Sequence, residues 1–142
     1  MTEERTTPDL VELVSSAFEA ANRRDLDAVV GFFASDAIFE GRGVPDTHVG
    51  RAAIRSMLEG WFGAYEELEF RLQDVRDFGS GVVFAVVAQE GIPAGSAGHG
   101  PLWQREGWVI LWERGLIARI TTIYLDIDDA RTAAERLAQE RG

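Results

Sequence analysis

The hydrophobic pattern of this chain changes its period near residue 68, and this change limits the possible folds more than any other feature. Before it, apolar residues recur at helical spacing in three segments, at about residues 8–22, 26–33 and 51–65. After it, side chains alternate in four stretches, 68–75, 82–89, 102–113 and 116–126, with breaks at glycine-containing turns. The pattern predicts helices followed by an antiparallel meander.

Two shorter elements complete the expected order. A strand at 37–40 lies between the second and third helices, and a mostly charged helix follows Asp128. Helices in one half and strands in the other are typical of an α+β fold. We expect a cone-shaped roll, in which a curved, mostly antiparallel sheet wraps around three helices, with a further helix at the C-terminus. No interdomain linker is visible, so residues 1–142 are expected to form one domain, with 1–6 loosely held.

The composition narrows the classes of partner. The net charge is −10, which disfavours nucleic acid and acidic membrane surfaces as partners, since both are bound through clusters of basic side chains. The chain contains no cysteine, which excludes disulfides and thiolate chemistry. No apolar run is long enough for a bilayer, and the first residues lack the pattern of a signal peptide. A cytoplasmic protein is the expectation.

Three stretches carry a resemblance to a known superfamily. They are NRRDLDAVVGFFASDAIFE, HVGRAAIRSMLEGWF and WVILWERGLIARITTIYLD, and together with the element order they cover nearly the whole chain. The chain resembles the nuclear-transport-factor-2-like superfamily and, within it, the SnoaL-like group. That superfamily includes ketosteroid isomerase, limonene epoxide hydrolase, polyketide cyclases and non-catalytic binding proteins, so the resemblance implies a fold and leaves the activity open.

The resemblance places the catalytic positions of these relatives on residues that do not carry the same chemistry. The base of ketosteroid isomerase falls on Gly41, beside Glu40. The Asp–Arg–Asp cluster of limonene epoxide hydrolase falls on Gln89, Val87 and Thr122, and the catalytic Asp of SnoaL-type cyclases also falls on Thr122. A threonine hydroxyl is not a base at neutral pH without an activating partner. We therefore expect an inner wall without the usual carboxylates.

Aromatic side chains are candidates for a ligand pocket. Phe18, Phe39 and Trp61 lie on helix and strand faces that should point into the cone, and Trp108 is expected to point inward as well. Rings in these positions either line a pocket for a flat or bulky apolar molecule or fill a core, and the sequence leaves both open. Gly60 and Gly63 weaken the third helix and leave room for a close approach by another element.

A few polar side chains are candidates for chemistry at such a pocket. Gln89 and Thr122 are expected on inner strands, where they would bind one oxygen of a ligand or satisfy each other. Glu40 and Tyr124 are the candidates for proton transfer; a solvated strand end and a core tyrosine are the alternatives. His48 and His99 lack the spacing of metal ligands, so we expect no metal and no cofactor.

Two functions remain open, beside a third in which the domain is only a structural dimer module with a filled interior. The first is a small-molecule-binding SnoaL-like domain that catalyses an isomerisation, cyclisation or hydrolysis of a polyketide-, steroid- or terpene-like compound. The second is a non-catalytic ligand-binding or accessory protein. The resemblance implies a homodimer in either case.

Overall fold

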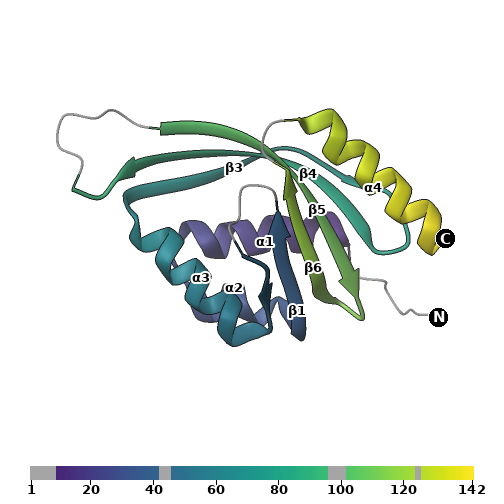
Figure 1. The fold of residues 1–142 in the computed structure, drawn as a ribbon, viewed down its shortest axis with the longest axis horizontal. Coiled ribbons are helices and arrows are strands. Elements are labelled where there is room, and N and C mark those ends of the chain that lie inside the picture. Colours follow the sequence, from purple (N-terminus) through teal and green to yellow (C-terminus); the bar gives the residue numbers. More distant parts are fainter. Residues whose placement is uncertain (1–8, 42–45, 96–101, 124–125) are drawn as a thin grey trace, which may run out of the picture.

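A computed structural model describes residues 9–41, 46–95, 102–123 and 126–142. Its helices and strands follow one another along the chain as drawn in Figure 1: α1 (Leu10–Asn22), α2 (Leu26–Gly31), β1 (Phe33–Gly41), β2 (His48–Val49), α3 (Arg51–Gly63), β3 (Tyr65–Asp77), β4 (Val82–Pro93), β5 (Leu102–Glu113), β6 (Leu116–Ile123) and α4 (Ile127–Arg141).

The strands form one curved, open sheet in the order β2-β1-β6-β5-β4-β3. β1 and β6 pair in parallel, and every other neighbouring pair is antiparallel. Breaks in register occur in β1, β3 and β6, where bulges let a strand bend more sharply. The predicted α+β roll is therefore confirmed, with the four-strand meander in place.

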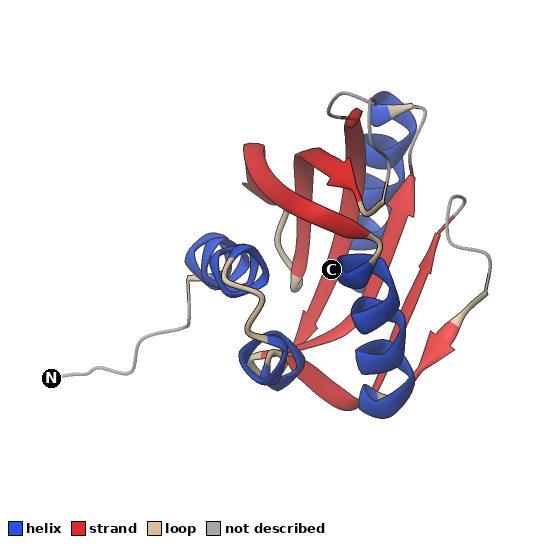
Figure 2. Ribbon diagram, turned by 90° about the vertical axis from the view of Figure 1, so that its left-hand side faces the viewer, coloured by secondary structure: helices blue, strands red, loops and turns tan. Residues whose placement is uncertain are grey.

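Helices cover both faces of the sheet (Figures 1 and 2). Helices α1, α2 and α3 lie on the hollow side, where they bury a core that includes Phe18, Phe39 and Ile54. Helix α4 lies on the other side, where Ala130 and Ala134 pack against side chains of β4 and β5. Strands buried on both faces carry continuous apolar runs, which explains the uninterrupted apolar sequence at the start of β4.

Several element bounds differ from the prediction. The second helix ends at Gly31 and β1 begins at Phe33, two residues on, because the apolar stripe of the helix continues directly into the strand. The two-residue strand β2 was expected to be loop. Helix α3 ends at Gly63, and Tyr65, which was assigned to its buried stripe, is the first residue of β3.

Side chains fix the ends of the helices and their contacts with the sheet. The carboxylates of Asp9, Asp25 and Asp126 accept backbone N–H groups in the first turns of α1, α2 and α4. Arg51, at the start of α3, donates from Nε to the backbone oxygen of Phe33 at 2.8 Å. Within the described residues, no helix has the length and apolarity needed to cross a bilayer.

Candidate functional site

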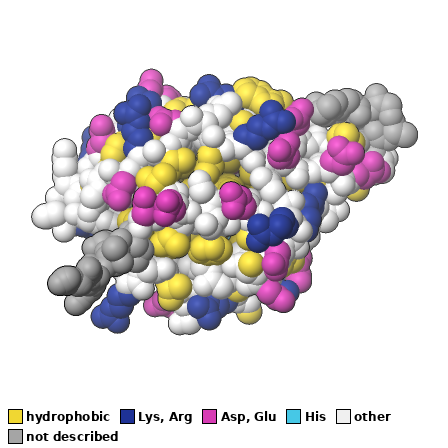
Figure 3. Space-filling view, turned by 180° about the vertical axis from the view of Figure 1, so that it is seen from behind, with side chains coloured by type: hydrophobic (Ala, Val, Ile, Leu, Met, Phe, Trp, Pro, Cys, Tyr) yellow, Lys and Arg dark blue, Asp and Glu magenta, His cyan; other side chains and the backbone are white. Residues whose placement is uncertain are grey.

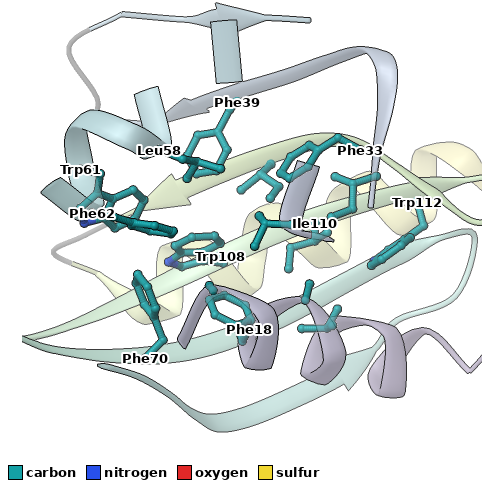
Figure 4. A pocket seen from close by; sticks show the side chains of 16 residues that line it. Phe18, Phe33, Phe39, Leu58, Trp61, Phe62, Phe70, Trp108, Ile110 and Trp112 are labelled. Atoms are coloured by element: carbon teal, nitrogen blue, oxygen red, sulfur yellow. The ribbon is translucent and has the colours of Figure 1, made fainter. Parts of the chain in front are cut away.

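Aromatic side chains from both layers meet inside the cone (Figure 4). They enclose an apolar cavity of about 50 Å³. Its walls come from α1, α2, α3 and the strands β1, β3, β5 and β6: Val14, Ala17, Phe18, Ala21, Val29, Phe33, Phe39, Leu58, Trp61, Phe62, Phe70, Trp108, Ile110, Trp112, Ile117 and Ile120. The volume is about a third of the about 150 Å³ of an engineered apolar cavity that binds benzene. The interior is thus mostly filled by rings.

Trp108 is at the centre of this aromatic cluster. Its ring lies 5.2 Å from that of Phe18, 5.7 Å from that of Phe39 and 6.2 Å from that of Trp61, measured between centroids. The Phe39 ring is nearly perpendicular to both tryptophan rings. Edge-to-face contacts of this kind stabilise aromatic pairs beyond the area they bury.

The structure brings together the four aromatic residues that sequence reasoning selected. Phe18, Phe39, Trp61 and Trp108 all line the cavity, and the inward orientation expected for Trp108 is confirmed. Trp103 lies on the opposite face of β5 and is 60% exposed. The alternation of side chains along the strand separates these two tryptophans.

The same inner face of β5 carries a carboxylate that sequence reasoning missed. Glu106 is 1% exposed. Its Oε1 accepts a hydrogen bond from Trp108 Nε1 at 2.6 Å, and its Oε2 accepts a short hydrogen bond from Gln104 Nε2. Trp108 therefore joins the aromatic cluster to a buried acid, since its ring faces the cavity while its N–H holds Glu106.

Burial raises the pKa of the Glu106 carboxyl above its ordinary value. The hydrogen bonds from Trp108 and Gln104 act in the opposite direction, because they favour the charged form, but they do not outweigh the loss of water. Both carboxylate oxygens accept hydrogen bonds, an arrangement that suits the ionised group. Glu106 is thus a buried acid whose pKa is raised, a property typical of catalytic carboxylates.

Further polar side chains lie on the neighbouring strands of this inner face. In the strand register, Val87 lies opposite Glu106, Gln89 lies opposite Gln104, and Thr122 lies opposite Trp108. Glu106 is therefore between the inner-face positions of Gln89 on β4 and Thr122 on β6. Both side chains are buried, and Gln89 Oε1 and Thr122 Oγ1 have no hydrogen-bond partner among the described residues.

Two residues from other strands limit the space around this polar group. Gln89 Nε2 donates to the hydroxyl of Tyr65 at 3.4 Å. Gly41 lies beside Thr122 in the parallel pair of β1 and β6, so closely that a Cβ at Gly41 would overlap Thr122 Oγ1. A side chain of any kind at Gly41, on which the resemblance places the base of ketosteroid isomerase, would collide with Thr122.

Glu40 does not belong to this inner-face group. It precedes Gly41 on β1 and therefore points to the outer face, where it lies 3.5 Å from Arg119 Nη1 and accepts a hydrogen bond from Thr121 Oγ1 at 3.3 Å. The alternation of the strand thus places this candidate for proton transfer away from the cavity, at the strand-end position that was its alternative. Tyr124 and His99 lie outside the described residues, and His48 belongs to the edge strand β2.

No carboxylate lines the cavity itself, as expected, but the inner face of the sheet carries one that is hydrogen-bonded to the cavity residue Trp108. Glu106 supplies it from the strand between Gln89 and Thr122, the two positions at which the resemblance implied acids. The sequence held the signal, because Glu106 precedes Trp108 by two residues and so shares its face. Within the ranges that the structure describes, no group of three or more His, Asp or Glu side chains is placed to hold a metal ion.

Comparison with known families agrees with this geometry. The model of the SnoaL-like domain matches residues 14–120, which is most of the chain. The protein belongs to the SnoaL-like family. The resemblance noted in its sequence is thereby confirmed, and the match spans the helices of the hollow side together with β5, the strand that carries Glu106 and Trp108.

Solved structures support the fold of this SnoaL-like protein. A protein from Catenulispora acidiphila with a ketosteroid isomerase-like fold, solved in complex with trimethylamine, is 18% identical with a TM-score of 0.72, over 84% of this chain and 87% of its own. A candidate polyketide cyclase from Xanthomonas campestris is 23% identical with a TM-score of 0.65, over 87% and 95% of the two chains.

A third similar structure is SalBIII, an epoxide hydrolase/cyclase-like enzyme of pyran ring formation in the polyether salinomycin. It is 22% identical with a TM-score of 0.70, over 80% of this chain and 88% of its own. No curated protein sequence matches the chain significantly. Identities this low establish the fold, and the activity must be argued from the site of this chain.

Proposed function

We propose that this SnoaL-like protein binds a small organic molecule beside the aromatic cluster and transfers a proton to or from it through Glu106. The observation that carries the proposal is a carboxylate that is 1% exposed, held on both oxygens, and placed against the ring of Trp108. A base in such a site is desolvated and oriented before the substrate arrives, which raises its catalytic value.

The other side chains have supporting parts in this proposal. Phe18, Phe39, Trp61 and Trp108 contact the apolar body of the substrate. Gln89 and Thr122 bind a polar group of the substrate, since each has an unsatisfied buried atom beside Glu106. We propose Tyr124, the residue after β6 in the sequence, as a further proton donor.

The class of reaction follows from the transfer of one proton by Glu106. Glu106 takes a proton from carbon or from water and returns it at a second position, which serves an isomerisation, a cyclisation or a hydrolysis. The polyketide- and polyether-processing relatives favour a polyketide-, steroid- or terpene-like substrate. We further propose a cytoplasmic homodimer, for which the exposed Leu102 and Trp103 at the start of β5 offer an apolar contact.

One observation favours the second candidate function, a non-catalytic binding or accessory protein. The cavity of about 50 Å³ is too small for a multi-ring substrate unless the rings move apart. A test of proton transfer separates the two functions without knowledge of the natural substrate.

The test uses 5-nitrobenzisoxazole, a flat molecule whose N–O bond breaks when a base removes its carbon-bound proton, giving a coloured phenolate. We expect the wild-type rate to rise with pH and reach a plateau once Glu106 is ionised. Glu106→Gln should lose about 10²-fold or more, the usual contribution of a general base. Glu40→Gln, on the outer face, should retain the rate. Equal rates for wild type and Glu106→Gln would remove the proton-transfer function.

A further inference from the structure

Glu106 has no positively charged partner in the part of the chain that the structure describes. Its two hydrogen bonds come from an indole and an amide, both neutral. None of the ion pairs found among the described residues includes it. A buried ionised group is usually paired, because removal from water destabilises an isolated charge strongly. The missing partner is the first indication of a cationic ligand.

Among the described residues, the strands beside Glu106 place no positive side chain next to it. The inner-face neighbours on β4 and β6 are Val87, Gln89 and Thr122, all neutral, and Tyr65 reaches the group only through its hydrogen bond to Gln89. Arg105, the adjacent residue on β5, points to the other face and donates to Gln73 of β3. An ionised Glu106 would therefore have no counter-charge from these strands.

Two buried polar atoms on the strands next to Glu106 lack a hydrogen-bond partner among the described residues. They are Gln89 Oε1, which only accepts, and the Thr122 hydroxyl, which can donate or accept; the Glu106 carboxylate also has further lone pairs. A carbonyl ligand could accept from Thr122 but would leave Gln89 Oε1 without a donor. A ligand with N–H groups would satisfy them, and a protonated amine would supply N–H groups and positive charge together.

The rings clustered around Trp108, which holds Glu106, suit a cation as well. The centroids of Trp61 and Trp108 are 6.2 Å apart, and the Phe39 ring stands nearly perpendicular to both. Ring faces attract ammonium groups and the polarised methyl groups attached to them. The net charge of −10 and the acidic side chains that border the hydrophobic band in Figure 3 also draw cations toward the molecule.

We propose that this site binds a protonated amine that carries a compact, branched apolar group. The ammonium donates to Glu106, with Gln89 and Thr122 as further acceptors, and the apolar group lies against Trp61 and Trp108. The cavity of about 50 Å³ limits the apolar part to a few carbons in the observed conformation. The inference rests on the proposed function, because it uses the same carboxylate, and it puts a small amine in place of the polyketide-, steroid- or terpene-like substrate proposed above.

The test compares three molecules of nearly one shape by calorimetry on the full chain: tert-butylammonium, neutral tert-butanol and anionic pivalate. We expect tert-butylammonium to bind at least about tenfold more tightly than tert-butanol, and pivalate not to bind, as expected for a desolvated ion pair. Equal affinities for the cation and the alcohol would overturn the proposal.

Matched variants separate the site from the acidic surface. Glu106→Gln should abolish the preference for the cation, whereas Glu113→Gln, which removes the same charge from the exposed end of β5, should keep it. Trp61→Leu is a second variant, with an intact carboxylate. It should lower the affinity for tert-butylammonium more than the affinity for tert-butanol. If Glu106→Gln still preferred the cation, the preference would come from the acidic surface, and the proposal would be overturned.

The two proposals fail separately. Ring opening of 5-nitrobenzisoxazole that depends on Glu106, without any preference for tert-butylammonium, overturns the amine ligand and retains proton transfer. Amine binding that depends on Glu106, without ring opening, retains the ligand class and removes proton transfer. The affinity for the amine should rise with pH as Glu106 ionises, because the cation binds the charged carboxylate. A pH-independent affinity in that range contradicts the ion pair.

Discussion

At the scale of single residues, Trp108 contributes a ring to the cavity wall and a hydrogen bond to the Glu106 carboxylate. The indole N–H lies 2.6 Å from Glu106 Oε1, and the ring forms part of the cavity wall. The hydrogen bond lowers the pKa of Glu106 against the larger effect of burial. Trp108 is thus a positioning residue for the proposed base as well as a wall of the pocket.

Trp108→Phe is expected to move the pH profile of ring opening to higher pH. The phenyl ring keeps much of the apolar wall but lacks the N–H, so the charged form of Glu106 loses a stabilising hydrogen bond and its pKa rises. Trp112→Phe is the matched control, because Trp112 lines the same cavity and its Nε1 is buried without a partner among the described residues. A Trp108→Phe profile identical to that of wild type would contradict the positioning role.

At the scale of elements, β5 contributes to both the candidate site and the contact with α4, because its side chains alternate between the two faces of the sheet. Its inner side chains include Gln104, Glu106 and Trp108, while Gly107 between them lies on the outer face. A Cβ at Gly107 would overlap the Cβ of Ala130, so this glycine lets α4 approach the sheet. The docking of α4 thereby covers the outer side of the strand that carries the site.

Gly107→Ala is expected to destabilise the protein by about 1–3 kcal/mol, the usual effect of overpacking a close contact. Gly60→Ala in α3 is the control, because a Cβ there meets nothing within 4 Å, and it should stabilise the helix by up to about 1 kcal/mol. Urea unfolding measures both changes in stability. A Gly107→Ala variant as stable as wild type would contradict the tight docking of α4.

The expectation that Gly60 and Gly63 admit another element is wrong, since both positions face open space.

At the scale of the whole molecule, the order of elements was predictable because the change from helical to alternating spacing is independent of tertiary contacts. The bounds of β5 were predicted correctly, since the glycine-rich segment before Leu102 and the Arg114-Gly115 turn after Glu113 delimit it. The four aromatic walls followed from the apolar stripes of these elements. The fold and the apolar half of the site were thus accessible from sequence.

The polar half of the site was not predicted, because a resemblance transfers positions and not charges. Positions that hold acids in relatives led to Gln89 and Thr122, whereas the carboxylate of this chain is on the strand between them. Glu40 was selected for its nearness in sequence to an aligned base, but the alternation of β1 turns it outward. Burial, which identifies Glu106, arises only in the folded protein and leaves no mark on the sequence pattern.

The burial of Glu106 should also appear in the pH dependence of folding stability. Its pKa in the folded state is raised above the ordinary value of 4.5, so the folded state holds this proton to higher pH than the unfolded state does. The free energy of unfolding of wild type should therefore fall, relative to that of Glu106→Gln, as pH rises through the folded-state pKa. Urea unfolding of both proteins over this range provides the measurement, and a difference that stays constant with pH would contradict the prediction.

The most direct test of the account is a titration of the Glu106 carboxyl carbon in the folded protein by ¹³C NMR, with Glu106→Gln assigning its signal. We expect a midpoint above 4.5, because burial outweighs the hydrogen bonds from Trp108 and Gln104. A midpoint at or below 4.5 would contradict it, since Glu106 would then be an ordinary ionised carboxylate with no special place in a proton-transfer site.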